Sequence, residues 1–247
     1  MELVPIVSYS GQVVVVTGGT RGIGRVIAGS FADAGAQVVV CGRTEPESTP
    51  FHFVKADLRE PDQAAAVVDA AVNAYGRIDV LVNNAGGSPS ADAATVSPRF
   101  VAKVVALNLL APFYTAQAAN AVMQQQSGGG VIVNIGSVAA RQPEPGTAAY
   151  AAAKAGLLTL TRALALEWAP KVRVNHITVG LIGSFYDSAE GVAVSRLIPM
   201  GRMAEPADVA AACLYLASPQ AGYLTGADLP VHGGGELPAR YVAAHPS

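Results

Sequence analysis

The chain has 247 residues, of which 51% are hydrophobic and 14% are charged, and its formal net charge is −2. This apolar composition excludes a disordered chain and is sufficient for a large hydrophobic core. The small share of charged residues indicates that part of the surface is buried between subunits. Because the chain is nearly neutral, we expect neither nucleic acid nor a membrane as a partner.

Segments typical of strands alternate with alanine-rich segments of helical length. In chain order, the expected strands are Val13–Thr17, Gln37–Cys41, Phe51–Lys55, Asp79–Asn83, Val131–Gly136, Val172–Ile177 and Ala227–Val231. The expected helices are Gly22–Ala34, Pro61–Tyr75, Val96–Gln126, Ala148–Trp168 and Glu205–Ala217. Strands that are apolar on both faces and alternate with helices predict a Rossmann-like, doubly wound α/β fold with a seven-stranded parallel sheet. No repeat or linker divides the chain, so we expect one domain over residues 1–247.

One connection between expected strands is unusually short. Only nine residues, Gly42–Pro50, separate the second strand from the third, and two of them are proline. A parallel crossover usually takes a dozen or more residues and contains a helix. We therefore expect an extended loop here, which leaves this end of the sheet less covered by helices.

Other features limit the cellular setting. The longest stretch without a charged residue, Val104–Ala140, is interrupted by polar residues, proline and glycine, so it does not predict a membrane span. The N-terminus lacks the basic and apolar regions of a signal peptide. Cys41 and Cys213 stand alone, without the spacing of metal ligands. We therefore expect two reduced, buried thiols, no metal site and a cytoplasmic location.

A glycine-rich turn, in the sequence VVVVTGGTRGIG, connects the first strand to the first helix. Gly18, Gly22 and Gly24 allow the backbone to turn tightly and to approach a ligand closely. The helix that follows offers free N–H groups to a pyrophosphate. The turn therefore predicts a dinucleotide site, although glycine also occurs in turns for steric reasons alone.

The end of the second strand bears on the choice of nucleotide. NAD sites usually carry an acidic residue there, which bonds the ribose 2′-hydroxyl. This chain has Gly42 followed by Arg43, and a second cation, Arg21, lies in the glycine loop. Guanidinium groups pair well with phosphate, so the two arginines favour NADP. NAD is the alternative, if both arginines are solvated surface residues.

The segment GTAAYAAAKAG places Tyr150 and Lys154 four residues apart, so they share one face of the expected helix. Taken alone, this pattern is more typical of an alanine-rich core helix whose lysine reaches toward solvent. The other motifs of the chain change that interpretation.

From about Gly11 to Gly234 the chain resembles the short-chain dehydrogenase/reductase family. Its motifs occur in the family order: TGxxxGxG at Thr17–Gly24, NNAG at Asn83–Gly86, then Asn108, Ser137, and YxxxK at Tyr150 and Lys154. Ser137 precedes Tyr150 by thirteen residues, which is the family spacing. The resemblance implies an NAD(P)-dependent oxidoreductase that transfers a hydride between nicotinamide and a secondary alcohol or ketone.

The resemblance implies a catalytic set of four residues. Tyr150 is expected to move the proton on the substrate oxygen, and the Lys154 ammonium to lower the pKa of the phenol. Ser137 is expected to hydrogen-bond the substrate oxygen. Asn108 is expected to interrupt its helix and to hold a water.

The resemblance also implies the cofactor contacts. They are Gly18, Thr20, Arg21, Ile23, Arg43, Asp57, Leu58, Asn84, Ala85, Gly86, Tyr150, Lys154, Ile182 and Ser184. The chain departs from the family pattern at several positions. Gly136 replaces the first serine of a common pair, which is expected to open space beside the substrate. His232 stands where aspartate is usual, and we assign it no catalytic role.

The segment Ser184–Ile198 is the expected substrate lid, and it is short and mostly apolar. It favours a hydrophobic substrate such as a steroid, an acyl thioester or a cyclic ketone. The alternative is a catalytically idle NAD(P)-binding sensor or structural subunit, for which an eroded catalytic set would be expected. An epimerase or dehydratase of the longer family branch would need a larger C-terminal domain.

The family usually forms tetramers through its two long helices, here Val96–Gln126 and Ala148–Trp168. Both are rich in small residues and poor in charge, as close packing requires, so we expect a homotetramer. The tail, residues 235–247, carries Leu237 and Tyr241 and is expected to lie against a subunit boundary.

Overall fold

The computed structural model describes residues 7–183, 188–237 and 244. Seven strands form one sheet in the order β3-β2-β1-β4-β5-β6-β7, and every neighbouring pair is parallel. The strands are β1 Val13–Thr17, β2 Gln37–Gly42, β3 His52–Lys55, β4 Val80–Asn83, β5 Gly130–Ile135, β6 Val172–Val179 and β7 Asp228–Val231. The predicted doubly wound α/β fold is confirmed, with strand ends that differ from the expected ones by at most two residues.

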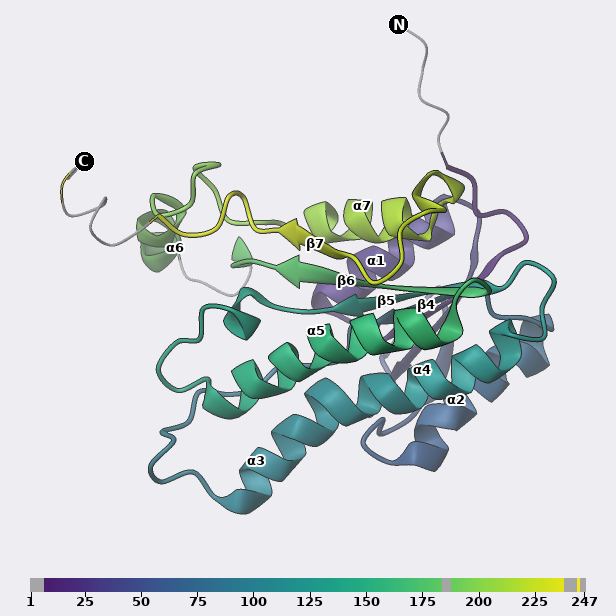
Figure 1. The fold of residues 1–247 in the computed structure, drawn as a ribbon, viewed down its shortest axis with the longest axis horizontal. Coiled ribbons are helices and arrows are strands. Elements are labelled where there is room, and N and C mark those ends of the chain that lie inside the picture. The colour runs from purple at the N-terminus through teal and green to yellow at the C-terminus, as the bar shows by residue number, and fades with distance from the viewer. Residues whose placement is uncertain (1–6, 184–187, 238–243, 245–247) are drawn as a thin grey trace, which may run out of the picture.

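Helices cover both faces of this sheet. They are α1 Gly22–Asp33, α2 Pro61–Tyr75, α3 Pro98–Val105, α4 Ala111–Met123, α5 Ala148–Trp168, α6 Ser188–Ser195 and α7 Pro206–Ala217. In Figure 1, α1 and α7 lie on one face, and α2, α4 and α5 lie on the other. Each face has its own apolar core, and β1 contributes Val14 and Val16 to the first and Val13 and Val15 to the second.

The helical run from Pro98 to Met123 is continuous, but its middle is a π segment, η1 Ala106–Leu110. The run begins where the Ser97 side chain accepts a hydrogen bond from the Phe100 backbone N–H at 3.2 Å. Among the described residues it is the one helix long and apolar enough, by length and composition, to cross a membrane. Core helices of globular proteins pass the same test, and here α4 packs on α2 while α3 packs on α5.

The two edges of the sheet are short. The connection from β2 to β3 contains no helix, as predicted, and no residue of β3 is fully buried. At the other edge, β7 bonds to β6 through alternate residues: the backbone N–H of His176 donates to Ala227 O, and that of Gly180 donates to Val231 O. Pro230 lies between them in β7.

The lid and tail were predicted only in outline. The expected lid contains a helix, α6, that the sequence did not reveal, and Ser184 lies outside the described residues. In the tail, the Leu237 backbone N–H donates to Leu197 O at 2.8 Å, so the tail begins against the end of the lid segment. Tyr241 also lies outside the described residues.

Candidate active site

A cleft of about 1040 Å³ lies at the carboxyl ends of the strands, where open α/β sheets bind their ligands. The cleft brings together nearly all of the residues predicted from the sequence. Those lining it are Gly18, Thr20, Arg21, Ile23, Arg43, Asp57, Leu58, Asn84, Ala85, Gly86, Ser137, Tyr150, Lys154 and Ile182. Asn108 is buried behind the wall of the cleft.

The glycine loop leaves bare backbone at one end of the cleft. Gly18 and Gly22 have φ angles of +65° and +53°, which side chains disfavour. A Cβ on Gly22 would meet no protein atom within 4 Å, whereas one on Gly24 would lie 2.4 Å from Gly18 O. The N-cap residue of α1, Arg21, makes no side-chain cap, and the first turn carries no acid. Open backbone beside an uncapped helix start fits the pyrophosphate of a dinucleotide.

The floor of the cleft is fixed by Thr17 at the end of β1. Its Oγ1 accepts hydrogen bonds from the backbone N–H groups of Asn84 at 2.9 Å and Ala85 at 3.0 Å. The Asn84 side chain returns a bond from Nδ2 to Thr17 O at 2.9 Å. These bonds lock the ends of β1 and β4 together, which explains the threonine of the TG motif.

Three arginines surround the end of the cleft near β2. Arg21 and Arg43 are exposed, so both are accessible to a phosphate that arrives from solvent. The third, Arg59, was not predicted: its Nε donates to Asp57 Oδ1 at 2.9 Å. This hydrogen bond with Arg59 holds the pKa of Asp57 below its usual value. The one local sequence signal for the Asp57–Arg59 pair is that the two residues stand two positions apart, in the sequence DLR.

Tyr150 and Lys154 lie on α5, with the Lys154 Nζ 5.8 Å from the centre of the tyrosine ring. Nζ is buried and donates to Ile135 O at 2.8 Å, and burial lowers the pKa of Lys154 to about 8. Burial raises the pKa of Tyr150, while a hydrogen bond with Ser137 acts in the opposite direction. In this structure burial is the larger effect on the phenol, in contrast to the expected lowering by the ammonium.

Asn108 lies in the π segment, so the predicted interruption of the helix is present. Its amide bonds the protein on both sides: Oδ1 accepts from Gly87 N at 2.8 Å, and Nδ2 donates to Gly87 O at 3.0 Å and Val104 O at 2.9 Å. Both amide N–H groups are therefore used within the protein, and the side chain ties the loop after β4 to the helix. The water-holding role expected of Asn108 stays a prediction.

Ser137 follows β5, and its Oγ accepts from the Ala139 backbone N–H at 3.2 Å. This bond starts a short 3₁₀ helix, η2 Val138–Ala140. The expectation that Gly136 opens space beside the substrate is wrong. A Cβ on Gly136 would lie 2.0 Å from Cε1 of the His176 ring, so the imidazole already fills that volume.

Comparison with known proteins decides the family. The family model described as enoyl-(acyl carrier protein) reductase matches residues 18–236. An uncharacterized oxidoreductase of Mycobacterium tuberculosis is 38% identical over 92% of this chain and 93% of its own. The chain belongs to the short-chain dehydrogenase/reductase family. It is an oxidoreductase of that family, whose members use NAD(P).

Other members of the short-chain dehydrogenase/reductase family show a range of substrates. The 3beta-hydroxysteroid dehydrogenase 1 of Eggerthella lenta is 37% identical, over 91% of this chain and 93% of that protein. The ligand-free aldohexose dehydrogenase of Thermoplasma acidophilum superposes with a TM-score of 0.86 and 31% identity, covering 91% of this chain and 94% of that one. Relatives of similar likeness therefore act on chemically different alcohols.

Proposed function

We propose that this protein transfers a hydride between a nicotinamide coenzyme and a secondary alcohol or ketone. The observation that carries the proposal is the meeting of Ser137, Tyr150 and Lys154 in one cleft with the bare backbone of the glycine loop. Bound nicotinamide would supply or accept the hydride. Tyr150 gives or takes the proton on the substrate oxygen, and Ser137 holds that oxygen through its hydroxyl.

We further propose a hydrophobic substrate, such as a steroid, an acyl thioester or a cyclic ketone. Leu107, Leu181 and Ile182 line the cleft, and the Eggerthella lenta relative is named for a steroid. The test is a panel of hydrophobic ketones and alcohols beside sugars and polyols, followed by the absorbance of NADPH or NADH. Turnover confined to the sugars would contradict this substrate class. Coenzyme binding without turnover on any compound would favour the idle sensor or structural subunit.

The proposed coenzyme is NADP. If Arg43 and Arg21 both bond the 2′-phosphate, charge-assisted bonds of about 1.5–3 kcal/mol each would favour NADP at least about tenfold. Arg59 is already bonded to Asp57, so it adds less. We expect Arg43→Ala to weaken NADPH binding and to spare NADH binding, and Gly42→Asp to reverse the preference by repelling the phosphate. The measurement is the Kd of each coenzyme by fluorescence titration.

Arg25 provides the control for this prediction, because it is exposed on α1 and does not line the cleft. Arg25→Ala should leave the ratio of the two Kd values unchanged. Equal wild-type affinities for NADPH and NADH, with no response to Arg43→Ala, would overturn the assignment to NADP.

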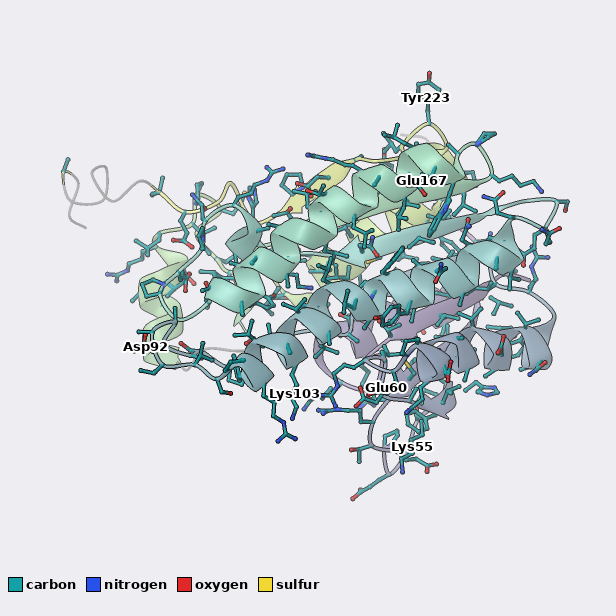
Figure 2. The ribbon with its side chains drawn as sticks, turned by 60° about the horizontal axis from the view of Figure 1, so that its bottom comes forward. Lys55, Glu60, Asp92, Lys103, Glu167 and Tyr223 are labelled. Carbon is teal, nitrogen blue, oxygen red and sulfur yellow. The ribbon has the colours of Figure 1, made fainter. Side chains whose placement is uncertain are left out.

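We propose that the protein assembles as a homotetramer through the run Pro98–Met123 and through α5. Leu110, in the run, is 36% exposed, and Leu166, on α5, is 85% exposed. Tyr223, which lies between α7 and β7 and so on neither helix, is fully exposed. Figure 2 shows Tyr223 pointing away from the body of the molecule. Burying such apolar groups against a second copy would stabilise the assembly. Light scattering at micromolar concentration should give four times the mass of one chain, whereas the mass of a monomer would contradict this.

We also propose that the chain acts as one domain, since a single sheet contains every described strand. We propose a cytoplasmic location because of the state of the two cysteines, Cys41 and Cys213. Both thiols are free and buried, and burial raises the pKa of Cys41 to about 11. Thiols of this kind are unreactive structural groups, as is common in a reducing compartment.

A further inference from the structure

The carboxylate of Asp228, in β7, is bonded by side chains from three other positions. Its Oδ1 lies 2.7 Å from His176 Nδ1 and accepts from Thr178 Oγ1 at 2.7 Å, and its Oδ2 accepts from Arg141 at 2.6 Å. Only 5% of its side chain is exposed. Burial raises the pKa of Asp228, but the bonds from His176 and Thr178 outweigh it, so the pKa falls below the usual value. The group is therefore ionised at neutral pH.

His176, on β6, lies directly behind Gly136. The ring has no exposed surface, and a Cβ on Gly136 would lie 2.1 Å from its Nε2. Since the ionised carboxylate can only accept, Nδ1 carries a proton. Among the described residues, Nε2 is the one buried side-chain nitrogen or oxygen without a hydrogen-bond partner. Such an atom is destabilising, so hydrogen bonding alone does not explain the position of the ring.

The two oxygens of Asp228 hold opposite ends of the segment that contains Ser137. Oδ1 holds the His176 imidazole through its bond to Nδ1, and this rigid ring lies against Gly136 at the start of the segment. Through Arg141, Oδ2 fixes the residue that follows η2 at its end. Neither His176 nor Asp228 lines the cleft, so any effect on the reaction passes through the segment between them.

We propose that Asp228, acting through His176 and Arg141, positions Ser137 for the substrate oxygen. This proposal rests on the proposed function, in which the Ser137 hydroxyl holds that oxygen. Ser137 also acts on Tyr150, because its hydroxyl lowers the pKa of the phenol, so the same placement bears on the proton carrier. A displacement of about 1 Å in such a group can cost up to about a hundredfold in rate. Asp228 is thus a positioning residue, and its bonds do more than fasten β7 to β6 and to the residue after η2.

The test is a double-mutant cycle with Asp228→Asn, which keeps the shape of the side chain and removes its charge. In the otherwise wild-type enzyme, kcat should fall about tenfold, with KM and the coenzyme Kd unchanged. In a Ser137→Ala enzyme, the same substitution should cause almost no further loss, because its target is absent. Steady-state kinetics of the four proteins give the result.

Asp79→Asn is the matched control, because Asp79 also bonds an arginine, Arg77, at 2.6 Å, but precedes β4 at the opposite end of the sheet. It should leave kcat unchanged. An equal loss from Asp228→Asn in both backgrounds would overturn the proposal in favour of a purely structural ion pair. If Asp228→Asn does not fold, Arg141→Gln serves in the same cycle, since the arginine side chain is 52% exposed. Full activity of Ser137→Ala alone would instead refute the role of Ser137 in the proposed function.

Discussion

Tyr150→Phe should lower kcat by about 10²–10⁴ and leave the coenzyme Kd nearly unchanged. The substitution keeps the buried ring and removes only the hydroxyl that would exchange a proton with the substrate. Because burial raises the pKa of Tyr150, the phenol of the free protein is protonated at neutral pH and poised to donate to a ketone. The measurement combines steady-state kinetics with a coenzyme titration of both proteins.

Tyr75→Phe is a suitable control, since Tyr75 lies at the end of α2 and does not line the cleft. It should have wild-type kinetics. A Tyr150→Phe enzyme that retained most of its turnover would remove Tyr150 from the reaction. A loss confined to coenzyme binding would instead assign Tyr150 a purely structural part in the cleft.

Lys154→Met should weaken both turnover and coenzyme binding, because one ammonium is proposed to act on Tyr150 and on the nicotinamide ribose. The lysine is confined: Nζ donates to Ile135 O, and a Cβ on Gly86 would lie 3.2 Å from it. Methionine fills the same space without a charge. We expect kcat to fall by at least about a hundredfold, together with a higher coenzyme Kd, both measured as for Tyr150.

The same variant should change how stability depends on pH. Folding lowers the pKa of Lys154 from 10.5 to about 8, so between these values the unfolded chain binds more protons than the folded one. The free energy of unfolding therefore gains a contribution that rises with pH over this window. Lys154→Met should abolish that rise in urea unfolding, whereas Lys103→Met, at an exposed site labelled in Figure 2, should retain it. An unchanged rise in Lys154→Met would mean that Lys154 titrates normally.

The sequence best predicts those structural features that residues close together in the chain determine. The bounds of α2 and α5 were predicted correctly, because Pro61 begins the first, Gly76 in a left-handed conformation ends it, and Pro170 follows the second. The residues of the cleft were predicted through the resemblance to the family. That they meet in one place follows from the fold, since parallel strands deliver the residues that follow them to one edge.

The missed features depend on contacts between distant segments. His176 and Asp228 are 52 residues apart in the chain, and the sequence around each residue contains no signal that predicts their contact. Gly136 illustrates the consequence. From the sequence, its missing side chain predicted free space beside the substrate, whereas in the structure the His176 ring, from the neighbouring strand, fills that space. The helix α6 was missed because its apolar residues have no clear helical period.

Pro230 has a consequence for how copies of this chain can associate. Alternate residues of β7 bond to β6, so the backbone of Pro230 faces the open side of the sheet, and proline has no N–H to offer there. A strand from another molecule arriving at this edge would find its ladder of hydrogen bonds interrupted. The β7 edge is thereby protected against edge-to-edge aggregation, and any ordered assembly along β7 must be held by side chains instead of a shared backbone ladder.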